Sequence, residues 1–356
     1  MREHNPYVLK IGALNCHGIK DKVDYPEFLE LAEEMDIFGV SETWLTNKDK
    51  ISLPGFSFIP KNRASEKIGA TKGGIGLFVK TEIRKFVKIR EEMSDENFLW
   101  CKIEKEFLGY QEDLYLCMVY IPPQESTREK RINTDHFETL LKRTAKIKSQ
   151  NIVFIGDFNS RTSDLNDIIY REKYDEAIQD FYPKIVNTKR SNQDRAMNNH
   201  GKKLTEFCTA SGCFIANGRT LGDFQGNLTC HEYNGSSAVD YGIISHSLQG
   251  NLRLFQVLLS TVGRDHCPIK MELRKGCKRE KLAKLDPKPR SIRWNEKSKL
   301  VFSKRMSNGK ISQKILEIDS LINENPFAID NIAEKLSEIY VPKQGANGKL
   351  IKKEKS

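Results

Sequence analysis

Apolar residues in this chain come mostly in short runs that have the length or the two-residue alternation of β-strands. Three longer stretches repeat their apolar residues every three or four positions, which predicts helices at residues 24–35, 134–148 and 202–211. Residues 54–116 hold strand-like segments at the spacing of a stacked antiparallel sheet, and residues 163–199 predict a helix and a loop. Strands are predicted at residues 7–15, 37–40, 56–59, 74–79, 83–89, 98–103, 114–120, 152–155, 213–216, 238–244 and 269–273.

The most informative strand end lies in residues 151–160, with the sequence NIVFIGDFNS. An apolar run predicts a buried strand, and Gly156 interrupts it just before Asp157 and Asn159. Period-two alternation places Asp157 and Asn159 on one side of the chain and Phe158 on the other. The carboxylate acceptor of Asp157 and the amide donor of Asn159 on one side of the chain are suited to binding a phosphate together with an attacking water. The alternative is an Asx turn, in which both side chains bond only the local backbone.

Polar or aromatic residues also end other predicted strands. Asn15 ends the first strand, Glu42 follows the second within SETW, and Tyr120 precedes two prolines. Each has an ordinary explanation, because strand-end acids are often caps and a tyrosine can belong to the core with a solvated hydroxyl. Together with Asp157, however, they indicate polar side chains gathered at one rim of a sheet.

Asp240 interrupts the otherwise apolar strand at residues 238–244. A buried carboxylate is costly without a partner, and His266, just before the last predicted strand, can supply one. An Asp–His pair fixes the ring tautomer and favours the protonated imidazole, which can donate to a phosphoryl oxygen. A lone histidine is more often structural, but the pair is a better catalytic candidate than either residue by itself.

Composition places the chain among soluble globular proteins. Its 356 residues are 38% hydrophobic and 30% charged, which is enough for a large core. Its apolar runs are far shorter than the ~20 residues of a membrane span, and its N-terminus lacks a signal core. We therefore expect an intracellular protein, nuclear or cytoplasmic, with no membrane partner. The eight cysteines are scattered without a CxxC pair, which favours reduced thiols over disulfides or a zinc site.

The positive charge is concentrated near the C-terminus. Residues 274–310 carry 14 Lys or Arg against three acids, a net charge of +11, whereas the whole chain carries +10. This segment is either a solvated linker or, with Trp294 and Phe302 interspersed, a grip on a polyanion. Residues 311–340 have apolar residues at helical spacing and predict a helix.

The strand-end motifs, in chain order, resemble those of the endonuclease/exonuclease/phosphatase superfamily. The resemblance covers about residues 7–274. The segments SETWL, RASEKIGATKGGIGLFVK and LWCKIEK are most similar to the endonuclease domains of non-LTR (LINE-type) retrotransposons, and RWNEKSKLVF resembles the linker that follows them. The resemblance implies an α/β fold, a four-layer sandwich of two mixed β-sheets flanked by helices, deoxyribonuclease I-like. The motifs are LN at Asn15, SETW at Glu42, VYIPP at Tyr120, GDFNS at Asp157, LTC at Thr229, VDYGIIS at Asp240 and RDHCPI at His266.

The resemblance implies a catalytic role for five residues. Asp157 would orient or deprotonate the attacking water, and Asn159 and Tyr120 would hydrogen-bond the phosphate. His266, oriented by Asp240, would stabilise the charge that develops on the phosphoryl group. The products would be a 3′-hydroxyl and a 5′-phosphate.

The resemblance also implies a metal site and contacts to duplex DNA. Glu42, with Asn15 and Asp265 nearby, would hold Mg²⁺, or Mn²⁺ in its place. The residues expected to bind the substrate are Thr229, Lys72 and Arg264.

The sequence departs from the family pattern at three points. Cys16 and His17 follow Asn15 where many relatives carry an acid or an amide, which alters the expected metal affinity. Arg264 stands where a serine usually precedes the Asp-His pair. No polymerase metal motif follows the domain, which indicates a truncated element, a separate reading-frame product or a gene derived from one.

We therefore expect a nuclease domain at residues 1–274, a basic linker at 275–310 and a partly helical tail at 311–356 that ends in disorder. The expected activity is Mg²⁺-dependent nicking of one strand of duplex DNA. An abasic-site repair endonuclease of the exonuclease III type shares every catalytic residue and is the alternative enzyme, whereas an inositol lipid phosphatase is less favoured because no phosphate-binding insert is evident. The alternative from another class is a domesticated DNA-binding module with weak or no catalysis. Nothing in the sequence indicates a protein partner or an oligomeric state.

Overall fold

The computed structural model describes residues 7–63, 72–124, 126, 135–168, 189–259, 262, 264–276 and 317. The chain divides into two units, Met1–Arg279 and Glu280–Ser356, and the fold below is that of the first. The helix expected at 311–340 and most of the expected linker lie outside the described residues. Within the described ranges, no helix is long and apolar enough to cross a membrane.

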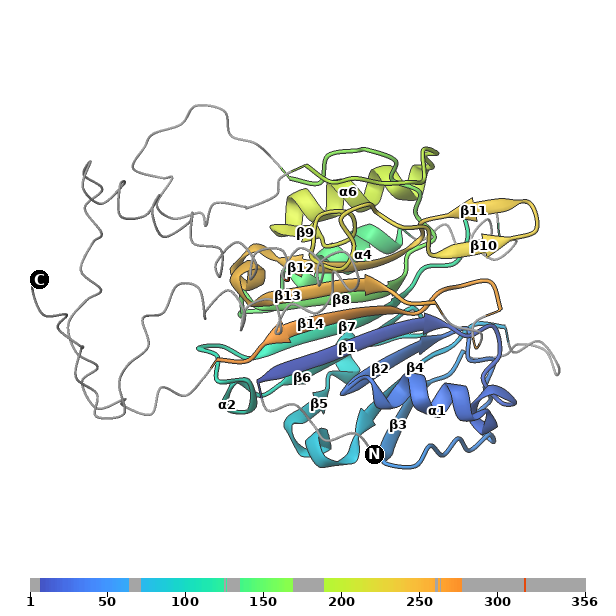
Figure 1. Ribbon diagram of the computed structural model, residues 1–356. Helices are drawn as coiled ribbons and strands as arrows, with labels where there is room; N and C mark the ends of the chain where they lie inside the picture. Colours follow the sequence, from blue (N-terminus) through green and yellow to red (C-terminus); the bar gives the residue numbers. More distant parts are fainter. Residues whose placement is uncertain are drawn as a thin grey trace, which may run out of the picture. The chain divides into compact units, whose positions relative to one another are not determined.

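Two six-stranded mixed sheets form the first unit (Figure 1). Two neighbouring strand pairs are parallel, β1 with β2 and β7 with β8, and the others are antiparallel. The first sheet is, in spatial order, β13 (Leu252–Val257), β14 (Ile269–Arg274), β1 (Val8–Asn15), β2 (Ile37–Ser41), β4 (Ile75–Lys80) and β3 (Phe56–Lys61). The second is β5 (Val87–Ile89), β6 (Phe98–Ile103), β7 (Leu114–Tyr120), β8 (Ile152–Asp157), β12 (Asp240–Ser245) and β9 (Cys213–Ile215).

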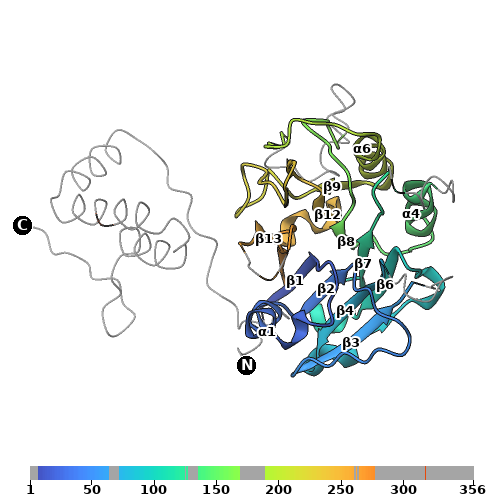
Figure 2. The ribbon, with the colours of Figure 1, turned by 90° about the vertical axis from the view of Figure 1, so that its right-hand side faces the viewer.

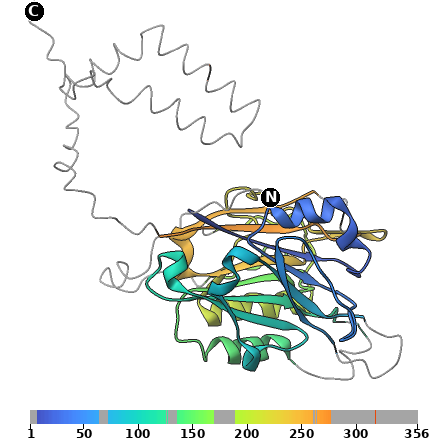
Figure 3. The same ribbon diagram turned by 90° about the horizontal axis from the view of Figure 1, so that it is seen from below.

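Helices cover the outer face of each sheet. Figures 2 and 3 show α1 on one side of the paired sheets and α4 with α6 on the other. One apolar cluster lies between the sheets, a second lies under α4 and α6, and a third lies under α1. The expected four-layer α/β sandwich is therefore confirmed. The helices are α1 (Pro26–Glu33), α2 (Lys105–Leu108), α4 (His136–Thr144) and α6 (Asn199–Ser211).

The central strands are apolar on both faces because both faces are covered. In β8, Val153 and Ile155 pack between the sheets, whereas Ile152 and Phe154 pack beneath the helices. This explains why β8 appears in the sequence as an unbroken apolar run instead of an alternating one.

The structure corrects several expected elements. Residues 83–89 were expected as one strand, but Thr81–Phe86 forms a 3₁₀ helix and only Val87–Ile89 is extended. The chain passes here from the first sheet to the second, so it must leave one plane before it enters the other. For the same reason the strands of residues 54–116 do not form one antiparallel sheet but divide between two.

Three short strands were not predicted. β13 adds an edge to the first sheet, and β10 (Cys230–Glu232) with β11 (Gly235–Ser237) forms a hairpin that projects at one end of the sheets (Figure 1). The hairpin is mostly exposed and polar, so it lacks an apolar pattern. The helix expected within residues 163–199 falls largely on 169–188, outside the described residues.

Candidate active site

Several strands end at one rim of the sandwich, where alternation directs their last side chains into the space between the sheets. In β8, Val153 and Ile155 belong to the core between the sheets, so Asp157, two positions later, points the same way. Tyr120 follows Met118 in the same manner in β7. Tyr120 and Asp157 are direct partners across the two strands. The candidate site therefore continues the apolar core at the point where it opens to solvent.

Asn15 reaches the same place from the other sheet. Ile11 and Ala13 of β1 pack between the sheets, and Asn15 is the next residue on that face. Its Nδ2 donates to Oδ2 of Asp157 at 3.0 Å, although 142 residues separate the two in sequence. A polar contact thus joins the two sheets at the rim.

Asp157 and Asn159 face one spot, as the alternation predicts. The backbone N–H of Asn159 donates to Oδ1 of Asp157 at 2.8 Å, and Nδ2 of Asn159 donates to Oδ2 at 3.1 Å. Nδ2 also donates to the carbonyl of Ile121 at 2.8 Å. Asn159 has φ of +46°, a conformation that asparagine tolerates better than most residues. Local bonds of the Asx type are therefore present, but they hold both side chains at the rim.

The glycine before Asp157 is required by packing. Gly156 has φ of +139°, and a Cβ there would lie 2.2 Å from the carbonyl oxygen of Val119 on the neighbouring strand. Any larger residue would push β8 away from β7 and displace Asp157 from Tyr120.

Burial changes the acidity of Asp157, whose side chain is almost fully enclosed. Burial and the negative charge of Asp240 raise the pKa of Asp157, and His266 opposes them, which leaves the pKa at about 7. The raised pKa makes the ionised Asp157 a stronger base than an ordinary aspartate, which suits a general base.

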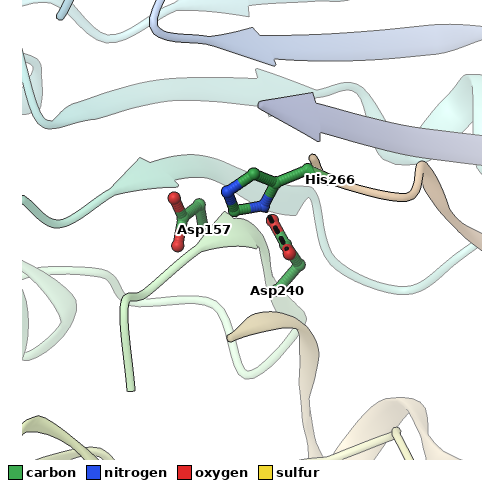
Figure 4. A group of neighbouring side chains, drawn as sticks. All are labelled: Asp157, Asp240 and His266. Carbon is green, nitrogen blue, oxygen red and sulfur yellow. Dashed lines mark hydrogen bonds and ion pairs between the residues drawn. The ribbon is translucent and has the colours of Figure 1, made fainter. Parts of the chain in front are cut away.

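His266 and Asp240 form the expected pair (Figure 4). Nδ1 of His266 lies 2.8 Å from Oδ2 of Asp240, and the ring lies between Asp240 and Asp157. Burial alone would lower the pKa of His266, but Asp240, a hydrogen bond with Cys230 and the charge of Asp157 together raise it above its ordinary range. The ring therefore carries a proton at neutral pH. The ligand-type atoms of Asp157, Asp240 and His266 all lie within 4.8 Å of one another.

Thr229 fixes the backbone of the strand that carries Asp240. Its side chain is fully buried, and its Oγ1 accepts hydrogen bonds from the backbone N–H groups of Val239 and Asp240, both at 3.0 Å. The sequence resemblance implied that Thr229 contacts the substrate; in this structure its hydroxyl is enclosed and bonded to the backbone. Thr229 instead positions the start of β12.

Glu42 lies opposite, just after β2. Its Oε1 accepts from the hydroxyl of Tyr120 at 3.0 Å and from Nδ2 of Asn15 at 3.1 Å. Burial is the main cause that raises the pKa of Tyr120, and the charges of Glu42 and Asp157 add to it, so the hydroxyl remains a donor. Glu42 has φ of +50°, a strained conformation that turns its carboxylate toward the rim.

Glu42 and Asp265 offer carboxylate oxygens to a divalent cation at the rim. No described residue donates a hydrogen bond to Oε2 of Glu42, and Oε2 faces Nδ1 of His17 at 3.9 Å, with Oδ2 of Asp265 at 4.0 Å from the same nitrogen. Hard cations such as Mg²⁺ take carboxylate oxygens at such rims. Asn15 turns its amide nitrogen to Glu42 and Asp157 and its oxygen to the backbone N–H of His17, so in this arrangement Asn15 orients the acids.

Two of the expected substrate contacts lie outside this cluster. Lys72 and Arg264 are exposed, so their side chains are accessible to a large ligand. A third cation, Arg63, was not predicted from the sequence. Its guanidinium packs against Gly73 and donates to the carbonyl of Lys72 at 3.1 Å, and its charge reaches Tyr120. No periodic signal marked Arg63, because it follows β3 in a loop.

A partly buried ion pair outside the cluster was also missed. Asp194 accepts from Nε and Nη2 of Arg161 at 2.8 and 2.6 Å, and from the backbone N–H groups of Ala196 and Ala238 at 3.0 and 3.1 Å. These bonds tie the chain just after β8 to the chain just before β12. Asp194 therefore holds in register the two strands that carry Asp157 and Asp240.

Comparison with known proteins agrees with this geometry. Residues 114–270 match the model of a family described as endonuclease-reverse transcriptase. No curated protein matches the sequence. Among solved structures, an AP endonuclease, LMAP from Leishmania major, has a TM-score of 0.55 at 13% identity and covers 77% of this chain and 90% of its own. The 3′ phosphatase NExo from Neisseria, bound to a product DNA hairpin, has a TM-score of 0.50 at 15% identity, with 74% and 99% covered.

A third solved structure is the endonuclease domain of TRAS1, a telomere-specific non-LTR retrotransposon. It has a TM-score of 0.49 at 12% identity, with 75% of this chain and 99% of that chain covered. At these identities the likenesses to the AP endonuclease and to the 3′ phosphatase show the fold alone. Residues 114–270, less than half of the chain, thus resemble the endonuclease-reverse transcriptase family, which supports an enzyme of the endonuclease type.

Proposed function

We propose that this protein is a DNA endonuclease of the retrotransposon type, which uses Mg²⁺, or Mn²⁺ in its place, to nick one strand of duplex DNA. The observation that carries the proposal is the meeting of Asn15, Asp157 and the Asp240–His266 pair at one rim. The family description supports the retrotransposon type. The DNA hairpin bound by the similar Neisseria 3′ phosphatase supports DNA as the substrate. The protein reads backbone shape more than base edges, and its sequence preference is modest.

Asp157 acts as the general base in this proposal. Its carboxylate takes a proton from a water, and the water oxygen attacks the phosphorus as the bond to the 3′ oxygen breaks. The backbone N–H of Asn159 donates to Asp157 at 2.8 Å, and in this proposal the side-chain amide of Asn159 orients the phosphate. The products are a 3′-hydroxyl and a 5′-phosphate.

His266 supplies positive charge to the phosphoryl group. Because Asp240 keeps the ring protonated, His266 donates to a non-bridging oxygen as negative charge develops there. Tyr120 offers its hydroxyl from the opposite side. A cation held by Glu42 and Asp265 would neutralise charge on the leaving 3′ oxygen.

Incubation of the full chain with supercoiled plasmid and Mg²⁺ should give nicked circles, and an excess of chelator should lower the rate by about 100-fold or more. Glu42→Gln should lower the rate similarly, because it removes a charged ligand. The matched control is Glu27→Gln on the exposed face of α1, which should nick like the unmodified protein. Rates that are equal with and without chelator would contradict the proposal, and duplex binding with no nicking would favour a DNA-binding module.

A cleavage assay on oligonucleotides distinguishes abasic-site repair from nicking of undamaged DNA. A duplex oligonucleotide with one abasic site is compared with its intact twin. We expect rates within about tenfold of each other, as for a nuclease that reads backbone shape more than a lesion. A preference for the abasic strand of several orders of magnitude would instead assign the protein to abasic-site repair.

The basic segment should add electrostatic affinity for DNA. Residues up to Gly276 belong to the fold, because the N–H groups of Lys275 and Gly276 donate to the carbonyls of Tyr7 and Leu108, both at 2.8 Å. A truncation after Arg279 therefore leaves the first unit whole. Fluorescence anisotropy on a duplex gives the slope of log affinity against log salt concentration. For the truncated chain, this slope should be less steep by about 0.9 for each phosphate that the basic segment neutralises in the full chain. Superimposable slopes would show that the segment is only a solvated linker.

A further inference from the structure

The loop that carries Asn159 is held by one side chain from the start of α6. Nδ2 of Asn198 donates to the backbone carbonyl of Asn159 at 3.1 Å, and Oδ1 of Asn198 accepts from the backbone N–H of Arg161 at 3.0 Å. The backbone N–H of Asn198 donates to the carbonyl of Arg161, also at 3.0 Å. Asn198 therefore binds both ends of the short segment that follows β8, although 39 residues separate it from Asn159.

The same side chain begins the helix. Asn198 is the N-cap of α6, and its Oδ1 accepts from the backbone N–H of Gly201 at 2.7 Å. Two N–H donors thus face the amide oxygen and a carbonyl faces the amide nitrogen. The reverse orientation would set donor against donor and acceptor against acceptor, so the amide has one orientation here. Each half of the amide has a separate task, because the oxygen caps the helix and the nitrogen holds Asn159.

Gly201 lets the helix approach this closely. A Cβ at Gly201 would lie 1.9 Å from the carbonyl oxygen of Arg161 and 2.5 Å from its carbonyl carbon. The first turn of α6 is therefore packed directly against the backbone of the loop, with no room for a side chain between them. This contact fixes the distance over which Asn198 reaches Asn159.

Asn159 has a conformation that needs such support. Its φ of +46° is uncommon for a residue other than glycine, and conformations of this kind persist where the surrounding structure fixes them. Its side-chain Nδ2 donates to Oδ2 of Asp157 at 3.1 Å and to the carbonyl of Ile121 at 2.8 Å. The direction of that amide depends on the backbone of Asn159, and the bond from Asn198 holds the carbonyl of that backbone.

We propose that Asn198 is a positioning residue for DNA nicking, which acts through Asn159. It fixes the carbonyl of Asn159 and so keeps the side-chain amide of Asn159 beside Asp157, where the phosphate is bound. Asn198 itself contacts no reacting atom. The inference rests on the proposed function for the role of Asn159, and it adds a residue of α6 to the parts of the chain that set the nicking rate.

The test separates the two halves of the Asn198 amide in the full chain. Asn198→Asp and Asn198→Ser each keep an oxygen that can cap α6, so their midpoints of urea unfolding should stay close to that of the unmodified chain. Both lack the amide nitrogen that holds Asn159. The nicking rate of plasmid at saturating protein should fall by about 10- to 100-fold in each, because a small displacement of a positioning group slows the reaction strongly.

Asn199→Asp is the matched control. This exposed asparagine follows Asn198 directly in the first turn of α6, so the substitution adds the same negative charge at nearly the same place. It should nick at the rate of the unmodified chain. Full nicking rates in both Asn198 variants would overturn the proposal. Slow nicking by Asn198→Asp with a full rate for Asn198→Ser would assign the loss to the added charge and would overturn it as well.

A spectroscopic readout follows Asn159 without any DNA. In the full chain labelled with ¹⁵N at asparagine, the side-chain amide resonance of Asn159 is identified by its loss in Asn159→Ser. This resonance should move in Asn198→Ser and keep its position in Asn199→Asp. An unmoved resonance in Asn198→Ser would contradict the positioning role. A resonance that moves in a protein that does not nick DNA would support the hold of Asn198 on Asn159 and contradict only the proposed function.

Discussion

Replacement of His266 by alanine is expected to slow DNA nicking by about 10²–10⁴-fold while the protein remains folded. The substitution removes the protonated ring that lies between Asp240 and Asp157 and leaves both acids without their cationic partner. The initial rate of plasmid nicking at saturating Mg²⁺ measures the effect. His231→Ala is the matched control, since this histidine is exposed on β10. A His266→Ala protein that nicks within about twofold of the unmodified chain would remove His266 from the proposed mechanism.

Asp240, the partner of His266, should determine how the nicking rate depends on pH. Asp240 raises the pKa of His266, so the ring stays protonated as the pH rises through its ordinary value of about 6.5 and activity is retained there. In Asp240→Asn this support is removed, so activity should fall as the pH rises past about 6.5. The pH profile of the nicking rate and the titration of the ring by NMR measure this shift. An unchanged titration would show that Asp240 does not control the charge of His266.

The largest expected effect on stability comes from Asp194→Ala. The substitution removes a carboxylate with an exposed fraction of 1% and leaves the buried N–H of Ala238 and the guanidinium of Arg161 without their acceptor. Loss of one partner of a buried pair costs about 3–5 kcal/mol. Because Arg161 is 38% exposed and water can solvate it, we expect a decrease of about 3 kcal/mol in the free energy of unfolding.

Urea unfolding monitored by circular dichroism, with the chain truncated after Arg279, measures this decrease. The matched control is Asp164→Ala, which removes an exposed carboxylate from the same region and should change stability by less than about 0.5 kcal/mol. Equal midpoints for the two variants would show that the four hydrogen bonds of Asp194 do not hold β8 and β12 together.

Local patterns in the sequence predict much of this structure correctly. The apolar run of β8, ended by Gly156, places Asp157 at a strand end, and alternation puts Asn159 beside it. The cost of an unpaired buried acid predicts that Asp240 needs a partner, and His266 lies 2.8 Å from it. These predictions succeed because they depend on the strand period and on the energetics of one or two side chains.

Other features have no local signal. The hairpin β10–β11 is short and polar, and Thr81–Phe86 is helical because the chain must cross between sheets. The sequence resemblance implied that Thr229 binds the substrate. In the structure, packing encloses its side chain and its hydroxyl accepts hydrogen bonds from the backbone. Arg63 follows a strand in a loop with no period to mark it.

The sequence by itself determined which residues end the strands and which face of each strand they occupy, because a strand alternates with a fixed period of two. Only the tertiary structure decided which of these ends meet. The contact of Asn15 with Asp157 spans 142 residues, and that of Tyr120 with Glu42 spans 78. Such contacts depend on how the two sheets pack face to face, and the same packing leaves His17 facing Glu42 and Asp265 while it buries Cys16.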